Sequence, residues 1–224
     1  MGREFVPIQS TRRQVTLNTM ISLNFVKWKL LLILFWLRHG RSRRFPFGCI
    51  VINPIKFSSK HIRLGRRVVI ANAGRLEAVT RYNKTIYTPM ILIGENVTIE
   101  QNLHLTCANR IVIGNNTAIA ANVTITDIEH PYTDVNIPIE RHDLVVKEVV
   151  IGEDSKIYNN AVILPGVHIG KHCVIGANSV VARDIPDFSV AVGAPSRVVK
   201  QYDRVLETWV VLGGNTSERS LHTE

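Results

Sequence analysis

The residue best placed to do chemistry is a histidine within a long polar stretch of the chain. His130 stands in the sequence ITDIEHPY, at the start of residues 126–148, and Pro131 stiffens the backbone beside it. An imidazole changes charge near neutral pH and can take a proton from a hydroxyl group, so His130 is a candidate general base. The alternative is a solvated loop histidine without a role. No serine or cysteine is placed as a nucleophile, which favours direct attack by the hydroxyl over a covalent intermediate.

A catalytic imidazole benefits from a partner that fixes its tautomer, and three carboxylates of the same stretch are candidates. In an extended strand, residue 128 shares a face with His130, whereas Asp127 and Glu129 point to the opposite face. Asp127 is therefore disfavoured as a direct partner and could instead contact the acceptor. Glu140 follows after the chain turns back and could orient His130. The sequence leaves Asp127, Glu129 and Glu140 open.

A six-residue repeat supplies the elements that must position these side chains. Aliphatic residues recur at every sixth position, often followed directly by glycine, in four runs: Leu64, Ile70 and Leu76; Ile93, Ile99 and Leu105; Ile113, Ile119 and Ile125; and Ile151, Ile157, Ile163, Ile169, Ile175 and Val181. A period of six suits a short strand plus a turn, with the aliphatic side chain inside and glycine permitting the turn conformation. Three units would close one triangular coil, and coils would stack at about 4.8 Å. The sequence predicts an all-β protein built as a parallel β-helix.

The repeat is interrupted at three places. Residues 77–92 form an insertion, residues 106–112 add two positions, and residues 126–148 form the long excursion that contains His130. A long ordered loop that leaves a rigid solenoid is a common location for function.

The positive charge of the chain is concentrated at its N-terminus. The net charge is +9, and residues 1–47 hold nine Lys or Arg against one acid. The unbroken apolar run at 30–37 is too short for a membrane span of about 20 residues, and no small-residue cleavage site of a secretory signal follows it. We expect a helix within residues 20–47 that packs on the first coil or contacts the inner face of an anionic membrane.

These patterns divide the chain into three parts. Residues 1–47 are a basic N-terminal helical segment, of which 1–19 are candidates for disorder, and residues 48–200 form the β-helix with its loop 126–148. Residues 201–224 are expected to form a C-terminal helix and tail, because apolar residues in 198–212 recur at three- and four-residue steps. Cys49, Cys107 and Cys173 form no CxxC pair, so we expect reduced structural thiols.

Two stretches carry the pattern of a known family. VVIGEDSKIYNNAVILPGVHIGKHCVIGANSVVARDIPDFSVAVGAPSRVVK resembles the hexapeptide-repeat acyltransferases. ILIGENVTIEQNLHLTCANRIVIGNNTAIAANVTITDIEHPY is similar to the lipopolysaccharide and capsule O-acetyltransferases of that superfamily, which also contains galactoside and maltose O-acetyltransferases. The resemblance covers about residues 62–200. It implies a left-handed parallel β-helix, a homotrimer, and acetyl-CoA in a groove between subunits.

The resemblance also implies site residues. His130 matches the catalytic histidine of the family. Asn102 and His104 lie at the level of the acceptor pocket, and Tyr158 stands where many relatives carry Trp and keeps a ring that can flank a substrate. The CoA pattern maps onto small residues that admit the pantetheine and cations that meet its phosphates: Ala161, Ala177, Ala182, Arg183, Arg197 and Lys200. No metal is expected.

The expected function is acetyl-CoA-dependent O-acetylation of a sugar hydroxyl in surface polysaccharide (O-antigen or capsule) biosynthesis. The enzyme would be a cytoplasmic homotrimer that can contact the inner face of the membrane through residues 20–47. No nucleic-acid partner is expected. The alternative is a sugar-nucleotide or other small-molecule acetyltransferase on the same fold, although residues 1–60 are too short and apolar for an extra nucleotide-binding domain. A metalloenzyme would need three converging histidines, which the spacing does not indicate. A purely structural β-helix would not explain the loop that carries His130.

Overall fold

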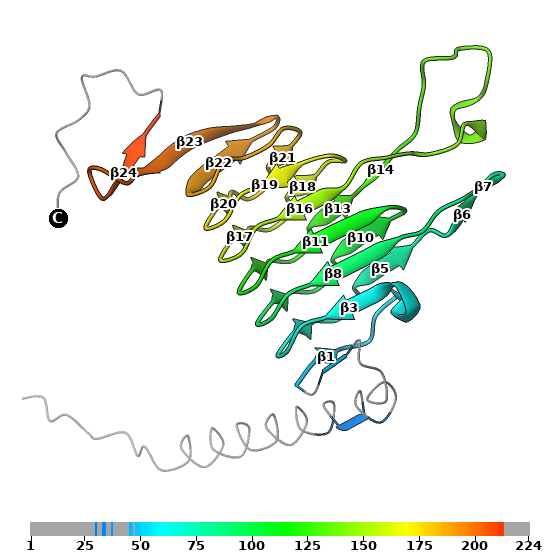
Figure 1. The fold of residues 1–224 in the computed structure, drawn as a ribbon, viewed down its shortest axis with the longest axis horizontal. Coiled ribbons are helices and arrows are strands. Elements are labelled where there is room, and N and C mark those ends of the chain that lie inside the picture. Colours follow the sequence, from blue (N-terminus) through cyan, green and yellow to red (C-terminus); the bar gives the residue numbers. More distant parts are fainter. Residues whose placement is uncertain (1–29, 31–32, 35–36, 38–44, 47, 213–224) are drawn as a thin grey trace, which may run out of the picture.

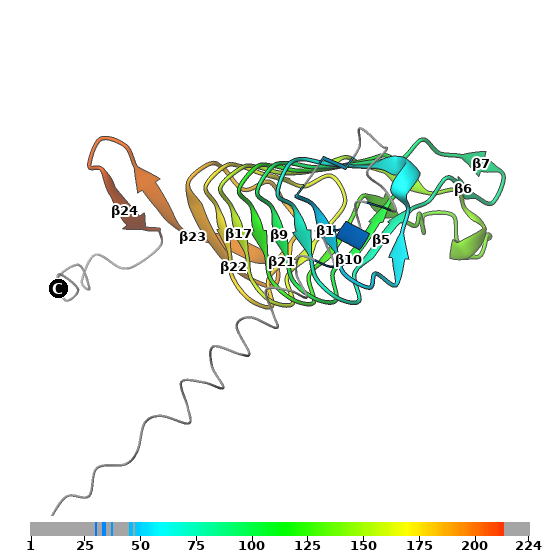
Figure 2. The same cartoon turned by 90° about the horizontal axis from the view of Figure 1, so that it is seen from below.

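The chain winds into a three-sided solenoid of short parallel strands (Figure 1). The computed structural model describes residues 30, 33–34, 37, 45–46 and 48–212. Figure 2 shows the coils following one another along one axis, with two excursions leaving the same side. Each coil contributes one strand to each of three sheets, so neighbouring strands in a sheet come from successive coils.

The three sheets account for most of the strands. The first sheet contains β1 (Ile50–Val51), β4 (Val69–Ile70), β9 (Thr98–Ile99), β12 (Ala118–Ile119), β17 (Lys156–Ile157), β20 (Val174–Ile175), β22 (Ser189–Gly193), β23 (Ser196–Asp203) and β24 (Thr208–Val211). The second contains β2 (Lys56–Phe57), β5 (Arg75–Ala78), β10 (His104–Cys107), β13 (Thr124–Thr126), β18 (Val162–Ile163) and β21 (Val180–Val181). The third contains β3 (Ile62–Leu64), β8 (Met90–Ile93), β11 (Arg110–Ile113), β16 (Val149–Ile151) and β19 (His168–Ile169). A short 3-10 helix, η1 (Ser59–His61), precedes β3.

The strand register confirms the six-residue repeat. In the first sheet Ile99 pairs with Ile119, which pairs with Ile157. In the second sheet Leu105 pairs with Ile125, which pairs with Ile163. Each aliphatic residue therefore stacks on its equivalent one coil away, as the period predicts.

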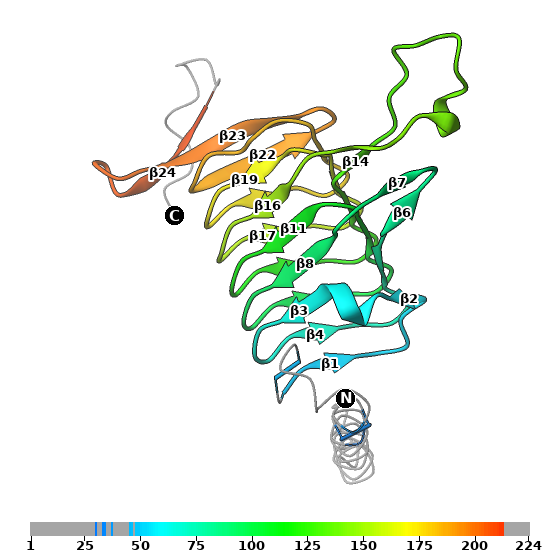
Figure 3. The ribbon, with the colours of Figure 1, turned by 45° about the vertical axis from the view of Figure 1, so that its right-hand side comes forward.

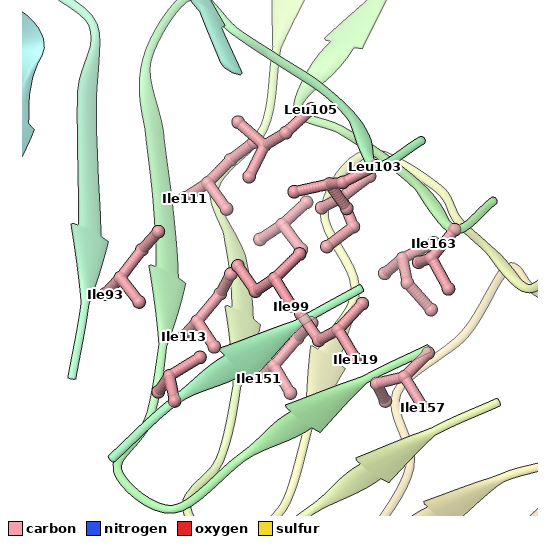
Figure 4. Packing of buried hydrophobic residues seen from close by; sticks show 14 of the residues in the cluster. Ile93, Ile99, Leu103, Leu105, Ile111, Ile113, Ile119, Ile151, Ile157 and Ile163 are labelled. Carbon is pink, nitrogen blue, oxygen red and sulfur yellow. The ribbon is translucent and has the colours of Figure 1, made fainter. Parts of the chain in front are cut away.

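The stacked aliphatic residues fill the interior of the solenoid. Ile99, Ile119 and Ile157 project inward beside residues from the other two sheets (Figure 4), and each is at most 1% exposed. Burial of a side chain of this size stabilises the fold by about 1.5–3 kcal/mol. At the start of the solenoid, Phe45 is 4% exposed and lies 5.7 Å from Phe57, ring centroid to centroid, so it covers the first coil.

The glycines of the repeat have a different role from the one the sequence predicts. A Cβ on Gly152 would lie 2.5 Å from the carbonyl carbon of Gly170 in the next coil, so glycine is required because the backbones approach closely. Non-glycine residues occupy most of the turn positions with positive φ. Four asparagines there have φ between 58° and 61°, and their side chains bond to one another in a column: Asn102, Asn122, Asn160 and Asn178.

Two interruptions of the repeat leave the solenoid as hairpins (Figure 3). The first is formed by β6 (Arg81–Tyr82) and β7 (Thr85–Ile86). The second, residues 126–148, contains β14 (Ile128–Glu129), η2 (Ile139–Arg141) and β15 (Val145–Val146), with β14 antiparallel to β15. The two additional positions at 106–112 form a corner between β10 and β11.

The predicted C-terminal helix at 198–212 is wrong. The segment forms β23 and β24, which pair antiparallel with each other, and β23 pairs antiparallel with β22 at the end of the first sheet. Val198, Val199, Tyr202, Trp209 and Val210 are β-branched or aromatic, and the open edge of the last coil provides partners for their backbone groups, so sheet pairing prevails over helical spacing.

Most of the predicted N-terminal helix lies outside the described residues. Leu30, Ile33, Leu34 and Leu37 are helical and between 52% and 69% exposed, so these four side chains do not cover the first coil. The predicted membrane contact and the predicted disorder of residues 1–19 stay predictions. Within the part of the chain that the structure describes, no helix has both the length and the apolar character that crossing a membrane requires.

Candidate active site

A pocket of about 420 Å³ lies between the second sheet and the two hairpins. Residues two apart in a strand share a face, so β5, β10 and β13 each present two side chains to this pocket. The register aligns them in two rows across the strands: Arg75, His104 and Thr124, then Glu77, Thr106 and Thr126. Tyr82, Ile128, His130 and Leu144 from the hairpins line the other side.

The floor of the pocket is polar and its two opposite charges are paired. Arg75 forms an ion pair with Glu77 on the same strand. His104 Nε2 lies 3.1 Å from Thr106 Oγ1. The floor therefore offers donors and acceptors of hydrogen bonds with no excess charge among these strand residues.

His130 stands directly after β14, at the mouth of the hairpin 126–148. Its ring is partly buried, and Nδ1 is shielded from solvent with no hydrogen-bond partner among the described residues. The ring of Tyr82 meets the His130 ring edge to face, with centroids 5.4 Å apart and planes at 76°. Because Nδ1 is shielded, a bound hydroxyl group cannot reach it, and Nε2 is the ring nitrogen left to accept a proton from an acceptor in the pocket.

The candidate orienting carboxylates do not contact His130. Glu140 Oε2 lies 2.5 Å from the phenol oxygen of Tyr82, so Glu140 reaches His130 only through the Tyr82 ring. Glu129 forms an ion pair with Lys147, with Oε2 and Nζ 2.7 Å apart. These separations leave the tautomer of His130 without a carboxylate partner from this loop.

Asp127 faces the interior instead of the acceptor. It is fully buried, and its carboxylate accepts hydrogen bonds from the backbone N–H groups of Ala108 and Asn109, both at 2.7 Å. Its backbone oxygen accepts from the Lys147 N–H group at 2.9 Å. The extra residues at the corner 107–109 turn these N–H groups out of the strand ladder, and Asp127 satisfies them. Asp127 thus anchors the base of the loop, and the expected acceptor contact is not compatible with this geometry.

Cys107 donates to the same carboxylate. Its sulfur lies 3.3 Å from Asp127 Oδ2. Burial, together with the neighbouring Asp127 charge, raises the pKa of the Cys107 thiol far above its ordinary value. Cys107 is therefore a protonated structural donor and not a nucleophile.

The other residues expected near the acceptor divide between the pocket and the solenoid corners. His104 lines the pocket. Asn102 does not, because it occupies a left-handed turn and its amide bonds to Asn122 in the asparagine column. Tyr158 is 44% exposed, follows β17 of the first sheet, and lies beside Lys156 Nζ, 5.5 Å from the ring centroid.

Comparison with known proteins decides the family. A family model described as bacterial transferase hexapeptide (six repeats) matches residues 148–183. An Escherichia coli K12 protein named as a lipopolysaccharide biosynthesis O-acetyl transferase, WbbJ, is 32% identical over 179 residues, covering 77% of this chain and 84% of the relative. The chain belongs to the hexapeptide-repeat acetyltransferases. The predicted enzyme class and the left-handed parallel β-helix of this family are confirmed.

Other hexapeptide-repeat acetyltransferases match a smaller part of the chain. Galactoside O-acetyltransferase of Escherichia coli K12 is 37% identical over 116 residues, covering 51% of this chain and 56% of that protein. A hexapeptide-repeat acetyltransferase of Vibrio cholerae, crystallised with acetyl coenzyme A, is 23% identical and covers 70% of this chain and 72% of that chain, with a TM-score of 0.47.

The residues that the family pattern assigns to CoA lie on the last coils of this acetyltransferase and, for Arg197 and Lys200, on β23 directly after them. Five of them are exposed: Ala177, Ala182, Arg183, Arg197 and Lys200. Ala161 is fully buried in the core, so its side chain is not available to a ligand. Its position directly before β18 points the methyl group inward, as for the other small residues two places before a stacked aliphatic.

Sequence reasoning missed several residues of the pocket. Arg75, Glu77, Thr124 and Thr126 lie between the stacked aliphatic positions, and the alternation of strand residues could have indicated their outward direction. Tyr82 had no such signal, because its place beside His130 depends on how the insertion 77–92 folds. Among the described residues, no group of three or more His, Cys, Asp or Glu side chains is arranged to hold a metal ion.

Proposed function

We propose that this acetyltransferase transfers an acetyl group from acetyl-CoA to a hydroxyl group of a sugar acceptor during surface polysaccharide assembly. The observation that carries the proposal is the partly buried imidazole of His130 on the wall of a pocket with a polar floor. The similarity to WbbJ, a protein named for lipopolysaccharide biosynthesis, supports the class of acceptor.

His130 acts as the general base in this proposal. The acceptor hydroxyl oxygen attacks the thioester carbonyl carbon while His130 takes the hydroxyl proton. The tetrahedral intermediate collapses with cleavage of the carbon–sulfur bond, and the imidazolium returns the proton to the departing thiolate. The products are an acetyl ester of the acceptor and CoA. Cys107, the thiol next to the pocket floor, is buried and protonated, which is consistent with transfer without an acyl-enzyme.

The pocket floor favours an acceptor rich in hydroxyl groups and without net charge. Thr106, Thr124 and Thr126 can each donate and accept a hydrogen bond, and the charge of Arg75 is balanced by Glu77. The apolar side chains of Ile128 and Leu144 on the opposite wall can cover the less polar face of a sugar ring.

The donor site would lie along the last coils. Arg183, Arg197 and Lys200 are exposed cations suited to CoA phosphates, and Ala177 and Ala182 leave room for the pantetheine backbone. We also propose a cytoplasmic homotrimer, in which neighbouring subunits would complete the three donor grooves. Replacing the three cations by alanine should raise KM for acetyl-CoA, and have less effect with acetyl-pantetheine, which lacks the nucleotide. Equal effects on both donors would contradict this assignment.

The test of the function is the His130→Ala variant in a thiol-release assay with acetyl-CoA and a panel of sugar acceptors. Loss of a general base should lower kcat by about 10²–10⁴-fold. The matched control is His168→Ala, because His168 is an exposed histidine on the third sheet, outside the pocket. Turnover of His130→Ala within about threefold of the unmodified enzyme would contradict the proposal. Mild alkali separates the proposed ester product from an amide, which would indicate an amino-sugar acceptor.

A further inference from the structure

The hairpin β6–β7 is bound to the loop that carries His130 through the polar side chains at its tip. Tyr82 and Asn83 both reach the segment after Pro138. The phenol of Tyr82 donates to Glu140 Oε2 at 2.5 Å and lies 3.1 Å from the Glu140 backbone oxygen. The amide of Asn83 donates to the backbone oxygens of Glu140 and His142 at 3.2 and 2.9 Å.

Two further residues of the insertion continue these contacts. Thr85 Oγ1 donates to Asp143 Oδ2 at 2.6 Å. The phenol of Tyr87 accepts from the Leu144 N–H group at 2.8 Å and lies 3.3 Å from the Leu144 oxygen. Four side chains of the insertion 77–92 thus bond to four residues of the other hairpin. We call these contacts, of Tyr82, Asn83, Thr85 and Tyr87 with Glu140, His142, Asp143 and Leu144, the clasp. Figure 3 shows the hairpin and the loop projecting from the same side of the solenoid.

The clasp compensates for a weak connection within the loop itself. The two arms of the loop are joined close to its base, by the pairs Ile128–Val146 and Glu129–Val145 and by the contacts of Lys147 with Asp127 and Glu129. His130 is the first residue beyond that short ladder. The Asp127 anchor fixes the base of the loop but not the ring of His130. A general base must keep its orientation within about 0.5 Å to be effective, so another group has to hold this ring.

Tyr82 is placed to do so because it contacts both arms. Its ring meets the His130 ring edge to face on one arm, and its phenol binds Glu140 on the other arm. The hydrogen bond to Glu140 raises the pKa of Tyr82 above its ordinary value, which keeps the phenol protonated and donating. The same ring is part of the pocket wall.

We infer that Tyr82 is a positioning residue for His130, and that the clasp holds the loop in the conformation in which His130 faces the acceptor. This inference rests on the proposed function, in which His130 is the base. Neither the alternation of inward and outward residues along the strands nor the family pattern predicts a role for Tyr82.

The test compares variants that remove one part of the contact each. Tyr82→Phe keeps the ring and loses the bond to Glu140, whereas Tyr82→Leu also loses the aromatic edge. Glu140→Gln keeps an oxygen that can accept from the phenol, and Glu140→Ala does not. The matched control is Tyr132→Phe, a tyrosine of the same loop that is 67% exposed. Thermal unfolding of each variant shows that the fold is retained.

Two readouts distinguish positioning from simple structural support. We expect Tyr82→Leu to lower kcat by about 10- to 100-fold with KM for acetyl-CoA within twofold, because the donor site on the last coils is separate. We expect the Cε1–H resonance of His130, assigned with His130→Ala, to move in Tyr82→Leu because the neighbouring ring is removed. Tyr82→Phe and Glu140→Ala should have equal, smaller effects that do not add in the double variant, and Glu140→Gln should restore part of the loss.

The outcomes separate this inference from the proposed function. If Tyr82→Leu keeps kcat within twofold, or leaves the His130 resonance unmoved, the inference is wrong. Additive losses in Tyr82→Phe with Glu140→Ala would show that the two residues do not act together, which also contradicts it. The His130 resonance is measured without an acceptor. Full activity of His130→Ala would overturn the proposed function, and the resonance would still show whether Tyr82 contacts His130.

Discussion

Replacement of Asp127 should destabilise the protein strongly although the residue touches no substrate. In Asp127→Ala the N–H groups of Ala108 and Asn109 lose their acceptor within a buried corner. An unsatisfied buried donor costs about 1–3 kcal/mol, so two of them lower the free energy of unfolding by about 2–6 kcal/mol. This loss is a large part of the free energy of unfolding of a typical protein, about 5–15 kcal/mol. Asp127→Asn keeps one carbonyl oxygen and should lose about half as much.

The assay is urea unfolding followed by circular dichroism at one fixed protein concentration, since an oligomer gains stability with concentration. The control is Asp134→Asn, an exposed carboxylate of the same loop, which should change the free energy of unfolding by no more than about 0.5 kcal/mol. A loss below about 1 kcal/mol in Asp127→Ala would refute the reasoning, because the two N–H groups would then have found other partners.

Three other predictions follow from the solenoid and its termini. Gly152→Ala should lower the free energy of unfolding by about 1–3 kcal/mol, because the new Cβ would lie 2.5 Å from the backbone of the next coil. Gly74→Ala is the control and should be nearly neutral, because the atom nearest to its Cβ would be 3.4 Å away. Similar urea midpoints for the two variants would contradict the close-approach argument. Burial raises the pKa of the thiols of Cys49, Cys107 and Cys173, so all three should react slowly with a thiol reagent at pH 8. The free energy of unfolding should fall as the pH rises above about 8.5, because the thiols of the unfolded chain then lose their protons. Rapid labelling of the folded protein would count against this prediction. Deletion of residues 1–44 removes nine Lys or Arg and keeps the buried Phe45. The deletion should weaken binding to anionic vesicles in a co-sedimentation assay, because each Lys or Arg near the surface attracts anionic lipid. Equal binding of the full chain and the shortened form would show that the segment has no membrane role.

The sequence predicted the solenoid well because its signal is periodic and local. Ile99, Ile119 and Ile157 follow directly from spacing, since a coil repeats the same strand and turn and needs an inward aliphatic residue at the same place. The reason given for the glycines failed because a period does not distinguish a turn requirement from a close approach between coils. The C-terminal helix failed because helical spacing in a short segment does not reveal an open sheet edge nearby.

The candidate site could be predicted only in part. His130 was indicated by its place in an interruption and by the family pattern, and His104 by its level in the coil. Asp127 was assigned to chemistry because a carboxylate close to a histidine in sequence suggests a functional group, whereas its direction depends on the corner at 107–109. Tyr82 could not be predicted, because its contact with His130 joins two insertions whose paths no periodic rule determines.

The clasp also implies an order of folding. Where neither hairpin intervenes, hydrogen bonds between neighbouring coils join residues close in sequence, such as Asn160 with Asn178, 18 positions apart, and Asn102 with Asn122, 20 positions apart. The bonds of Tyr82 with Glu140 and Tyr87 with Leu144 join residues 58 and 57 positions apart. Closing a longer loop costs more entropy, and the clasp can form only when the coils between its two halves are in place. We expect the solenoid to grow coil by coil from short-range closures, so that a nascent or partly unfolded chain can be well ordered and still lack a working catalytic centre.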